Sequence, residues 1–193
     1  PASGQSDSDP LTQVVNKAGL VLNANAASKV FGQPDPTFTY SLAGFVLGEN
    51  AGSAGVTGAG TCSLVGGPYT SAGVYPDAIH CVPNTLAAAN YAFGSGSDGT
   101  FTILQATGAI TYLGQTYAVA GGSGSAEVNL TVDVGICTTN TVTYDFTPVG
   151  GGTTISTSTS PVSLPSGIYS VHVTLVGNED CTGATDDEIG RAH

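Results

Sequence analysis

The four cysteines are the residues of this sequence with the clearest chemistry. They stand at Cys62, Cys81, Cys137 and Cys181, without a C-x-x-C spacing or a nearby histidine pair, so a structural zinc site is not expected. An even number of cysteines in a chain rich in Thr and Gly predicts disulfides and an oxidising compartment. Three pairings are possible. If the chain holds two domains, locality favours Cys62 with Cys81 and Cys137 with Cys181, and buried free thiols are the alternative.

Two histidines lie on stretches that alternate like strands. His80 follows Asp77 by three residues, a spacing that points the two side chains to opposite faces of a strand. His172 follows Tyr169 by three and is expected to be exposed or in an ordinary hydrogen bond. The sequence places no nucleophile beside either histidine and contains no G-x-S-x-G. We therefore predict no catalytic residue.

Other patterns predict loops rather than sites. Residues 94–99, GSGSDG, match G-x-G-x-x-G, but a strand pattern follows instead of a helix, which favours a hairpin loop over a phosphate site. Acidic residues that could offer oxygen ligands to calcium are Asp7 and Asp9, Glu179 and Asp180, and Asp186, Asp187 and Glu188. None lies in a D-x-[DN]-x-[DN]-G pattern, so solvated acidic loops are the preferred interpretation. No cofactor or metal is predicted, and calcium is the alternative.

The elements that would carry these residues are short strands separated by Gly, Pro and Ser. We expect strands at Ala18–Asn25, Thr37–Leu42, Thr61–Val65, Tyr75–Val82, Tyr91–Phe93, Thr100–Leu104, Ala109–Leu113, Gln115–Val119, Ala126–Ile136, Thr141–Phe146, Thr153–Thr159, Val162–Leu164 and Ile168–Val176. The two strands at 109–113 and 115–119 are expected to pair. No stretch has a convincing amphipathic helix pattern, so the sequence predicts an all-β sandwich or barrel.

A phrase occurs twice, as SAGVYPDAIHC at 71–81 and as PSGIYSVHVTL at 165–175. In Greek-key sandwiches, a tyrosine near the start of a late strand caps a corner by bonding the nearby backbone. Tyr75 and Tyr169 fit that position in two successive sandwiches, and we predict a structural role for both. The glycine two residues earlier, Gly73 or Gly167, is expected to turn the chain with a positive φ.

Composition limits the classes of partner. The chain has 193 residues, of which 40% are hydrophobic and 9% charged, with a net charge of −11 and three Lys and Arg in total. Such a chain can form a core, and it cannot neutralise a phosphate backbone, so nucleic acid and anionic membrane surfaces are not expected partners. No stretch reaches the roughly 18 apolar residues of a membrane span. The chain lacks a signal peptide and begins at Pro1, so we expect a processed piece of a longer protein.

Three segments together resemble the MBG-type Ig-like module of bacterial surface proteins. They are SKVFGQPDPTFTYSLAGFVLGE, SAGVYPDAI and NTLAAANYAFGSGSDGTFTI, and the resemblance covers residues 17–104. Phe31 stands where that family usually has Tyr, and the cysteine pair is an additional feature. Residues 105–185, with GTTISTSTSPVSLPSGIYSVHVTLVGNEDCTG, resemble more loosely the Ig-like repeats of large secreted bacterial proteins.

The resemblance implies two tandem Ig-like Greek-key β-sandwich domains, at 17–104 and 105–185. Residues 1–16 would form an N-terminal arm or linker, and residues 186–193 a tail. It also implies a non-enzymatic structural or adhesive module, extracellular or at a cell surface, whose partners are neighbouring domains or identical subunits. No catalytic site is carried over.

Three classes of function follow. The first is a structural spacer in a surface or secreted protein. The second is binding of host or environmental glycans, which would need a pocket lined by Tyr or Phe and is disfavoured by the absence of Trp. The third is a filament subunit, in which Leu11, Val14 and Val15 belong to a strand that joins a neighbour's sheet edge head to tail. A disordered linker is the alternative for that segment.

Overall fold

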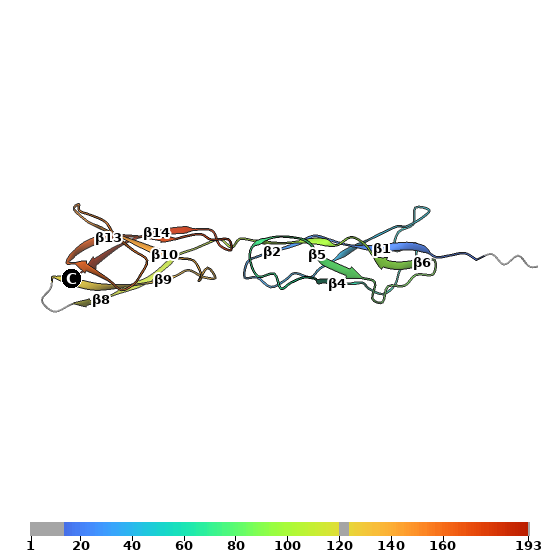
Figure 1. Ribbon diagram of the computed structural model, residues 1–193, viewed down its shortest axis with the longest axis horizontal. Helices are drawn as coiled ribbons and strands as arrows, with labels where there is room; N and C mark the ends of the chain where they lie inside the picture. The colour runs from blue at the N-terminus through green and yellow to red at the C-terminus, as the bar shows by residue number, and fades with distance from the viewer. Residues whose placement is uncertain (1–13, 120–123, 193) are drawn as a thin grey trace, which may run out of the picture. The chain divides into compact units, whose positions relative to one another are not determined.

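The structure, a computed structural model, describes residues 14–119 and 124–192 (Figure 1). Within these ranges the chain is all-β and contains no α-helix, which confirms the all-β class that the sequence predicts. Consequently, no helix of the described part could cross a membrane. The chain divides into two compact units that are not contiguous in sequence. Unit 1 comprises residues up to 26, 38–67 and 76–100, and unit 2 comprises residues 27–37, 68–75 and 101–193.

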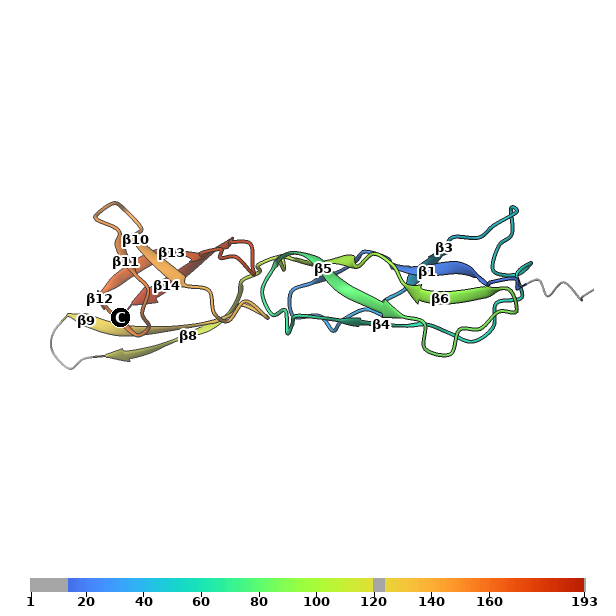
Figure 2. The ribbon, with the colours of Figure 1, turned by 45° about the vertical axis from the view of Figure 1, so that its right-hand side comes forward.

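Unit 1 is built around a three-stranded sheet of order β3-β1-β6 (Figure 2). Its strands are β1 (Ala18–Ala24), β3 (Tyr40–Ala43) and β6 (Tyr91–Ser95), and β1 runs antiparallel to β3 and parallel to β6. Alternation decides which residues of β1 are buried, because Leu20 and Leu22 are each 1% exposed whereas the residues beside them face outward.

A second sheet has the order β2-β7-β5-β4. Its strands are β2 (Ala27–Val30), β4 (Thr61–Leu64), β5 (Gly73–Val82) and β7 (Gly99–Leu104). In unit 1, β4 pairs antiparallel with β5, and in unit 2, β2 pairs parallel with β7. The strand β2 was not predicted, because its four residues, ASKV, lack an apolar alternation.

The later strands of unit 2 form two sheets, of order β12-β9-β8 and β11-β10-β13-β14. These strands are β8 (Thr111–Val119), β9 (Ser125–Asp133), β10 (Val142–Pro148), β11 (Ile155–Thr157), β12 (Val162–Pro165), β13 (Gly167–Leu175) and β14 (Ala184–Ala192). Both sheets contribute to one core, with Val128 and Leu164 from the first and Phe146 and Val171 from the second. This shared core is the arrangement of a β-sandwich.

Two predictions about unit 2 are wrong. Residues 109–119 do not form two short strands that pair with each other, because β8 is one strand that pairs along β9, with a bulge between Tyr112 and Gly114. The tail predicted at 186–193 is also corrected, because residues 184–192 form β14 and pair with β13 over its whole length. The sequence of β14 shows no apolar alternation, and its hydrogen bonds to β13 are contacts that only the fold supplies.

Candidate functional site

Two tyrosines occupy equivalent corners, one near the start of β5 and one near the start of β13. The hydroxyl of Tyr75 donates a 2.6 Å hydrogen bond to the carbonyl of Ser71, and that of Tyr169 donates a 2.9 Å bond to the carbonyl of Pro165. Each acceptor lies four residues before its tyrosine. Each tyrosine therefore fastens the start of its strand to the chain that precedes it, as expected for a corner tyrosine.

The glycine two residues before each tyrosine has a different role from the one predicted. Neither Gly73 nor Gly167 has a positive φ, so the expected turn is wrong. A Cβ at Gly73 would lie 3.3 Å from the hydroxyl oxygen of Tyr75, and one at Gly167 would lie 3.3 Å from Cε2 of Tyr169. The glycines leave room for the ring to fold back over the backbone.

The cysteines form two disulfides, Cys62–Cys81 between β4 and β5 and Cys137–Cys181 in unit 2. This is the local pairing that the sequence favours, and no cysteine is free. Cys81, Cys137 and Cys181 are each at most 2% exposed, so these three side chains belong to the cores that they join.

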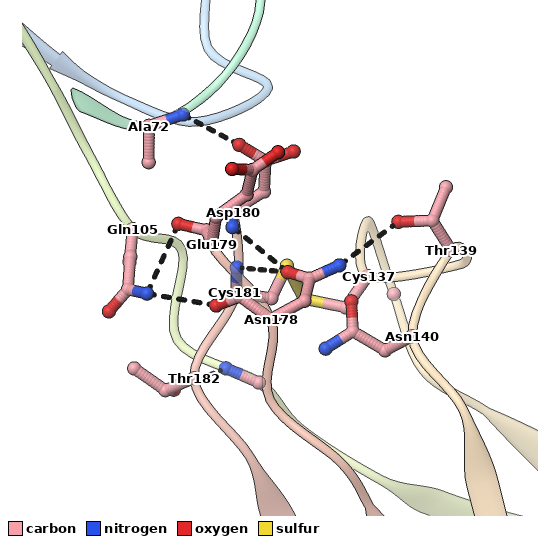
Figure 3. The surroundings of a disulfide bond; sticks show 12 residues. Ala72, Gln105, Cys137, Thr139, Asn140, Asn178, Glu179, Asp180, Cys181 and Thr182 are labelled. Carbon is pink, nitrogen blue, oxygen red and sulfur yellow. Dashed lines mark hydrogen bonds between the residues drawn. A yellow bond between two sulfur atoms is a disulfide. The ribbon is translucent and has the colours of Figure 1, made fainter.

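The Cys137–Cys181 disulfide lies in a small core of unit 2, which we call the disulfide cluster (Figure 3). Ala106 and Leu175 are buried against the two cysteines. The partly buried residues packed around them are Phe31, Ile110, Val134, Val142 and Ala184. The cluster thus joins four segments of unit 2. They are the connection between β2 and β3, the segment after β7, the connection between β9 and β10, and the loop between β13 and β14.

The β13–β14 loop is folded by Asn178. Its side-chain oxygen accepts hydrogen bonds from the N–H groups of Asp180 and Cys181, each at 2.9 Å. The carboxylate of Asp180 in turn accepts a 2.6 Å hydrogen bond from the N–H of Ala72, which also belongs to unit 2 (Figure 3). One carboxylate of the predicted acidic pair Glu179 and Asp180 is therefore a backbone acceptor. Among the described residues, no group of three His, Cys, Asp or Glu side chains is placed to hold a metal ion.

The segment after β7 is tied to the same loop (Figure 3). The side-chain amide of Gln105 donates to the carbonyls of Asn178 at 2.9 Å and Glu179 at 3.1 Å. Ala106 exchanges two backbone hydrogen bonds with the loop, donating to Asp180 and accepting from Thr182, each at 2.9 Å. Because Cys181 lies within this bonded stretch, the disulfide holds the partners of residues 105–106 in place.

The pair Phe31–Gly32 belongs to the same cluster. The N–H of Phe31 donates a 2.8 Å hydrogen bond to the carbonyl of Leu104, and the Phe31 side chain packs on the cluster. Gly32 has a φ of +78°, and a Cβ there would collide with the side chain of Ile136. The positive φ favours glycine at this position, whereas the contact with Ile136 involves the end of a side chain that is 47% exposed and can move aside.

Both described histidines face an aspartate that the sequence did not pair with them. Nδ1 of His80 lies 2.6 Å from Oδ1 of Asp98, and Nδ1 of His172 lies 2.5 Å from Oδ1 of Asp187. Asp98 belongs to the GSGSDG loop and Asp187 to β14, so strand pairing rather than sequence proximity supplies each partner. Ser63 is the cross-strand neighbour of His80 but makes no hydrogen bond to it, and no nucleophile–base pair is formed there.

Tyr91 is 2% exposed, yet its hydroxyl reaches the loop after β3. It accepts a 3.1 Å hydrogen bond from the N–H of Val46 and donates a 2.5 Å bond to the carboxylate of Glu49. The bond to Glu49 favours the neutral phenol and, together with burial, raises the pKa of Tyr91 above its ordinary value of 10.0. This site was not predicted, because Glu49 and Tyr91 lie far apart in the sequence.

The residues predicted for assembly are only partly described. Val14 and Val15 are 78% and 82% exposed and lie outside any strand. Leu11, Asp7 and Asp9 lie outside the described residues. In β14, Asp187 is exposed, and Asp186 and Glu188 pair through their backbones with β13.

The comparisons with known proteins identify one part of the chain. Residues 20–102 match the family model described as MBG domain (YGX type), which confirms the MBG-type resemblance predicted for residues 17–104. Phe31 and Gly32 stand at the Tyr-Gly position of that resemblance, and the looser resemblance of residues 105–185 stays a prediction. The match indicates a structural β module of the kind that surface proteins carry. Neither a curated protein nor a solved structure matches the chain.

Proposed function

We propose that the chain is a non-enzymatic structural module of an extracellular or cell-surface bacterial protein, a pair of β-sandwich domains that holds other parts of that protein in position. The observation that carries the proposal is the disulfide cluster, whose residues come from four separate segments of unit 2, together with the carboxylate of Asp180, which connects Ala72 of a fifth segment to them. A buried disulfide of this kind suits a protein that carries mechanical load or is exposed to proteases in an oxidising compartment. The MBG match supports a place in a surface protein.

Single-molecule stretching of the intact chain tests this proposal. The Cys137–Cys181 bond encloses a sequence separation of 44, which corresponds to about 150 Å of extended chain. We expect the oxidised chain to unfold without releasing this length, and to release it after treatment with a reductant. If the oxidised and the reduced chain unfold at the same low force, the role in carrying load is contradicted, because the disulfide then contributes nothing to mechanical resistance.

A second candidate is a filament subunit that assembles through its N-terminal segment. The exposure of Val14 and Val15, two apolar residues outside any strand, favours it. Deletion of residues 1–15, followed by light scattering and electron microscopy, tests this alternative. Open polymers from the intact chain that disappear after the deletion would support it, and their absence from the intact chain would exclude it.

Glycan binding receives less support from the described residues. A groove in unit 1 is lined by Leu86, Ala92 and Phe93, but its one tyrosine, Tyr91, is 2% exposed and presents no open ring face. A glycan array probed with the intact chain would measure this activity directly.

A further inference from the structure

The loop after β3 presents a single leucine at its tip. The N–H of Glu49 donates a 3.1 Å hydrogen bond to the carbonyl of Val46, which closes a tight turn around Leu47 and Gly48. Both central residues have positive φ, 55° for Leu47 and 75° for Gly48, as in a type I′ turn. The Leu47 side chain is 98% exposed. In Figure 2 the segment after β3 stands away from the sheets of unit 1.

Leucine is a poor choice for this position if the fold alone is considered. The central positions of a type I′ turn favour Asn, Asp or Gly, which tolerate a positive φ, and a large side chain there is an outlier. Leu47 also leaves its whole apolar surface in water, so it gains no burial in return. A strained residue without a packing role in its own unit points to a function outside that unit.

Contacts within the chain hold the turn of residues 46–49 in one conformation. The hydroxyl of Tyr91 accepts from the N–H of Val46 and donates to the carboxylate of Glu49, so one buried tyrosine holds both ends of the turn. The ring of Phe45 packs edge-on against Tyr91, with centroids 5.6 Å apart and an interplanar angle of 69°. A rigid apolar side chain binds with a smaller loss of conformational entropy than a mobile one.

A groove beside the same tyrosine has the properties that Leu47 requires. Its volume is about 300 Å³, and its lining includes Leu86, Ala87, Ala88, Tyr91, Ala92 and Phe93. Lys17 is the one charged residue in this lining. The chain has three Lys and Arg in total and a net charge of −11, so most of its surface repels an acidic partner. The positive charge of Lys17 makes this groove a place where a negatively charged group of a partner can bind.

We propose that this groove binds Leu47 of a second copy of the chain, with Glu49 of that copy facing Lys17. Charge complementarity supports the pairing, since Glu49 lies two residues from Leu47 and Lys17 lines the groove. The turn and the groove flank the same Tyr91, so one two-fold axis can satisfy both contacts and close a dimer. A lipid surface is a poorer occupant, because a single leucine on an acidic chain is a small anchor.

The substitution L47N separates this role from folding. Asn followed by Gly is a preferred type I′ sequence, so the variant is expected to melt at the same or a higher temperature than the natural chain. Sedimentation equilibrium of the full chain should show a reversible dimer, and L47N should raise its dissociation constant by at least about tenfold, the factor that burial of one leucine supplies. The matched control is V149N, which replaces an apolar residue of unit 2 that is 61% exposed and should leave the dimer unchanged.

Two charge variants test the orientation of the contact. E49Q retains an oxygen that can accept from Tyr91, and K17Q retains a donor, so each removes mainly charge. Each should weaken the dimer and make its affinity less dependent on salt. The proposal is overturned if the natural chain stays monomeric at high concentration, if L47N dimerises as well as the natural chain, or if deletion of residues 1–15 alone abolishes association. It is also overturned if the monomeric natural chain instead binds phosphatidylcholine vesicles through Leu47.

Discussion

The hydroxyl of Tyr169 donates a hydrogen bond of 2.9 Å to the carbonyl oxygen of Pro165, while its ring is buried in the core of unit 2. The two contributions can be separated. Y169F keeps the ring and should lower the free energy of unfolding by about 1 kcal/mol, whereas Y169A should lower it by about 3–5 kcal/mol. Urea unfolding measures both. A Y169F variant as stable as the natural chain would show that the corner bond contributes nothing.

The glycine before this corner should tolerate a methyl group less well than a glycine in open space. A Cβ at Gly167 meets the Tyr169 ring at 3.3 Å, whereas nothing lies within 4 Å of a Cβ at Gly94. G94A should therefore gain the usual 0.4–1 kcal/mol or so from a less flexible unfolded chain, and G167A should be about 1 kcal/mol less stable than G94A. Thermal unfolding of the two variants, compared side by side, measures this difference. Equal stabilities would mean that the ring can move aside.

The two disulfides should differ in how much they stabilise the chain. Their sequence separations are 19 for Cys62–Cys81 and 44 for Cys137–Cys181, for which the chain-entropy relation gives about 3 and about 4 kcal/mol. The double variant C137S/C181S should therefore lose more stability than C62S/C81S, as measured by denaturant unfolding. A larger loss from C62S/C81S would show that native packing, rather than loop length, sets the contribution.

Removing the carboxylate of Asp180 should free the N–H of Ala72, which donates to it at 2.6 Å. In D180A, hydrogen exchange at the Ala72 amide should become about tenfold faster, because the acceptor is lost. D180N keeps a carbonyl oxygen and should retain most of the protection. E179Q is the control, since Glu179 contributes only its backbone carbonyl to the cluster. Unchanged exchange in D180A would show that this bond does not hold the loop.

The raised pKa of Tyr91 predicts a loss of stability in alkali. The Tyr91 pKa is higher in the folded chain than in the unfolded chain, so the protonated phenol stabilises the fold. This contribution is fully present below pH 10.0, the ordinary tyrosine pKa, and is lost as the pH rises through the higher pKa of the folded chain. E49Q should lower the Tyr91 pKa, because a neutral amide oxygen accepts a hydrogen bond from the hydroxyl without repelling the negative charge of an ionised Tyr91. Ultraviolet difference titration, with Y91F to assign the signal, measures the shift. An unchanged titration in E49Q would exclude Glu49 as the cause.

Local pattern was sufficient for several features. The all-β class and most of the strands follow from alternation and turn residues, and distance along the chain favoured the disulfide pairing that the structure has. The corner tyrosines could also be recognised, because the bond from Tyr169 to Pro165 spans only four residues. Even there the role of Gly167 was misjudged, because the clash with the tyrosine ring depends on a side-chain position that sequence does not give.

The sequence by itself determined most of the strands, because side-chain alternation and turn chemistry act over a few residues. The strands β2 and β14 lack apolar alternation and are strands only through their pairing with β7 and β13. Only the tertiary structure decided which distant residues meet. Asp187 reaches His172 because β14 pairs with β13, and Glu49 reaches Tyr91 because β3, which precedes the Glu49 loop, lies in the same sheet as β6, which carries Tyr91. Such contacts depend on strand order and register, which are set by the burial of the whole core and leave no signal in the residues next to either partner.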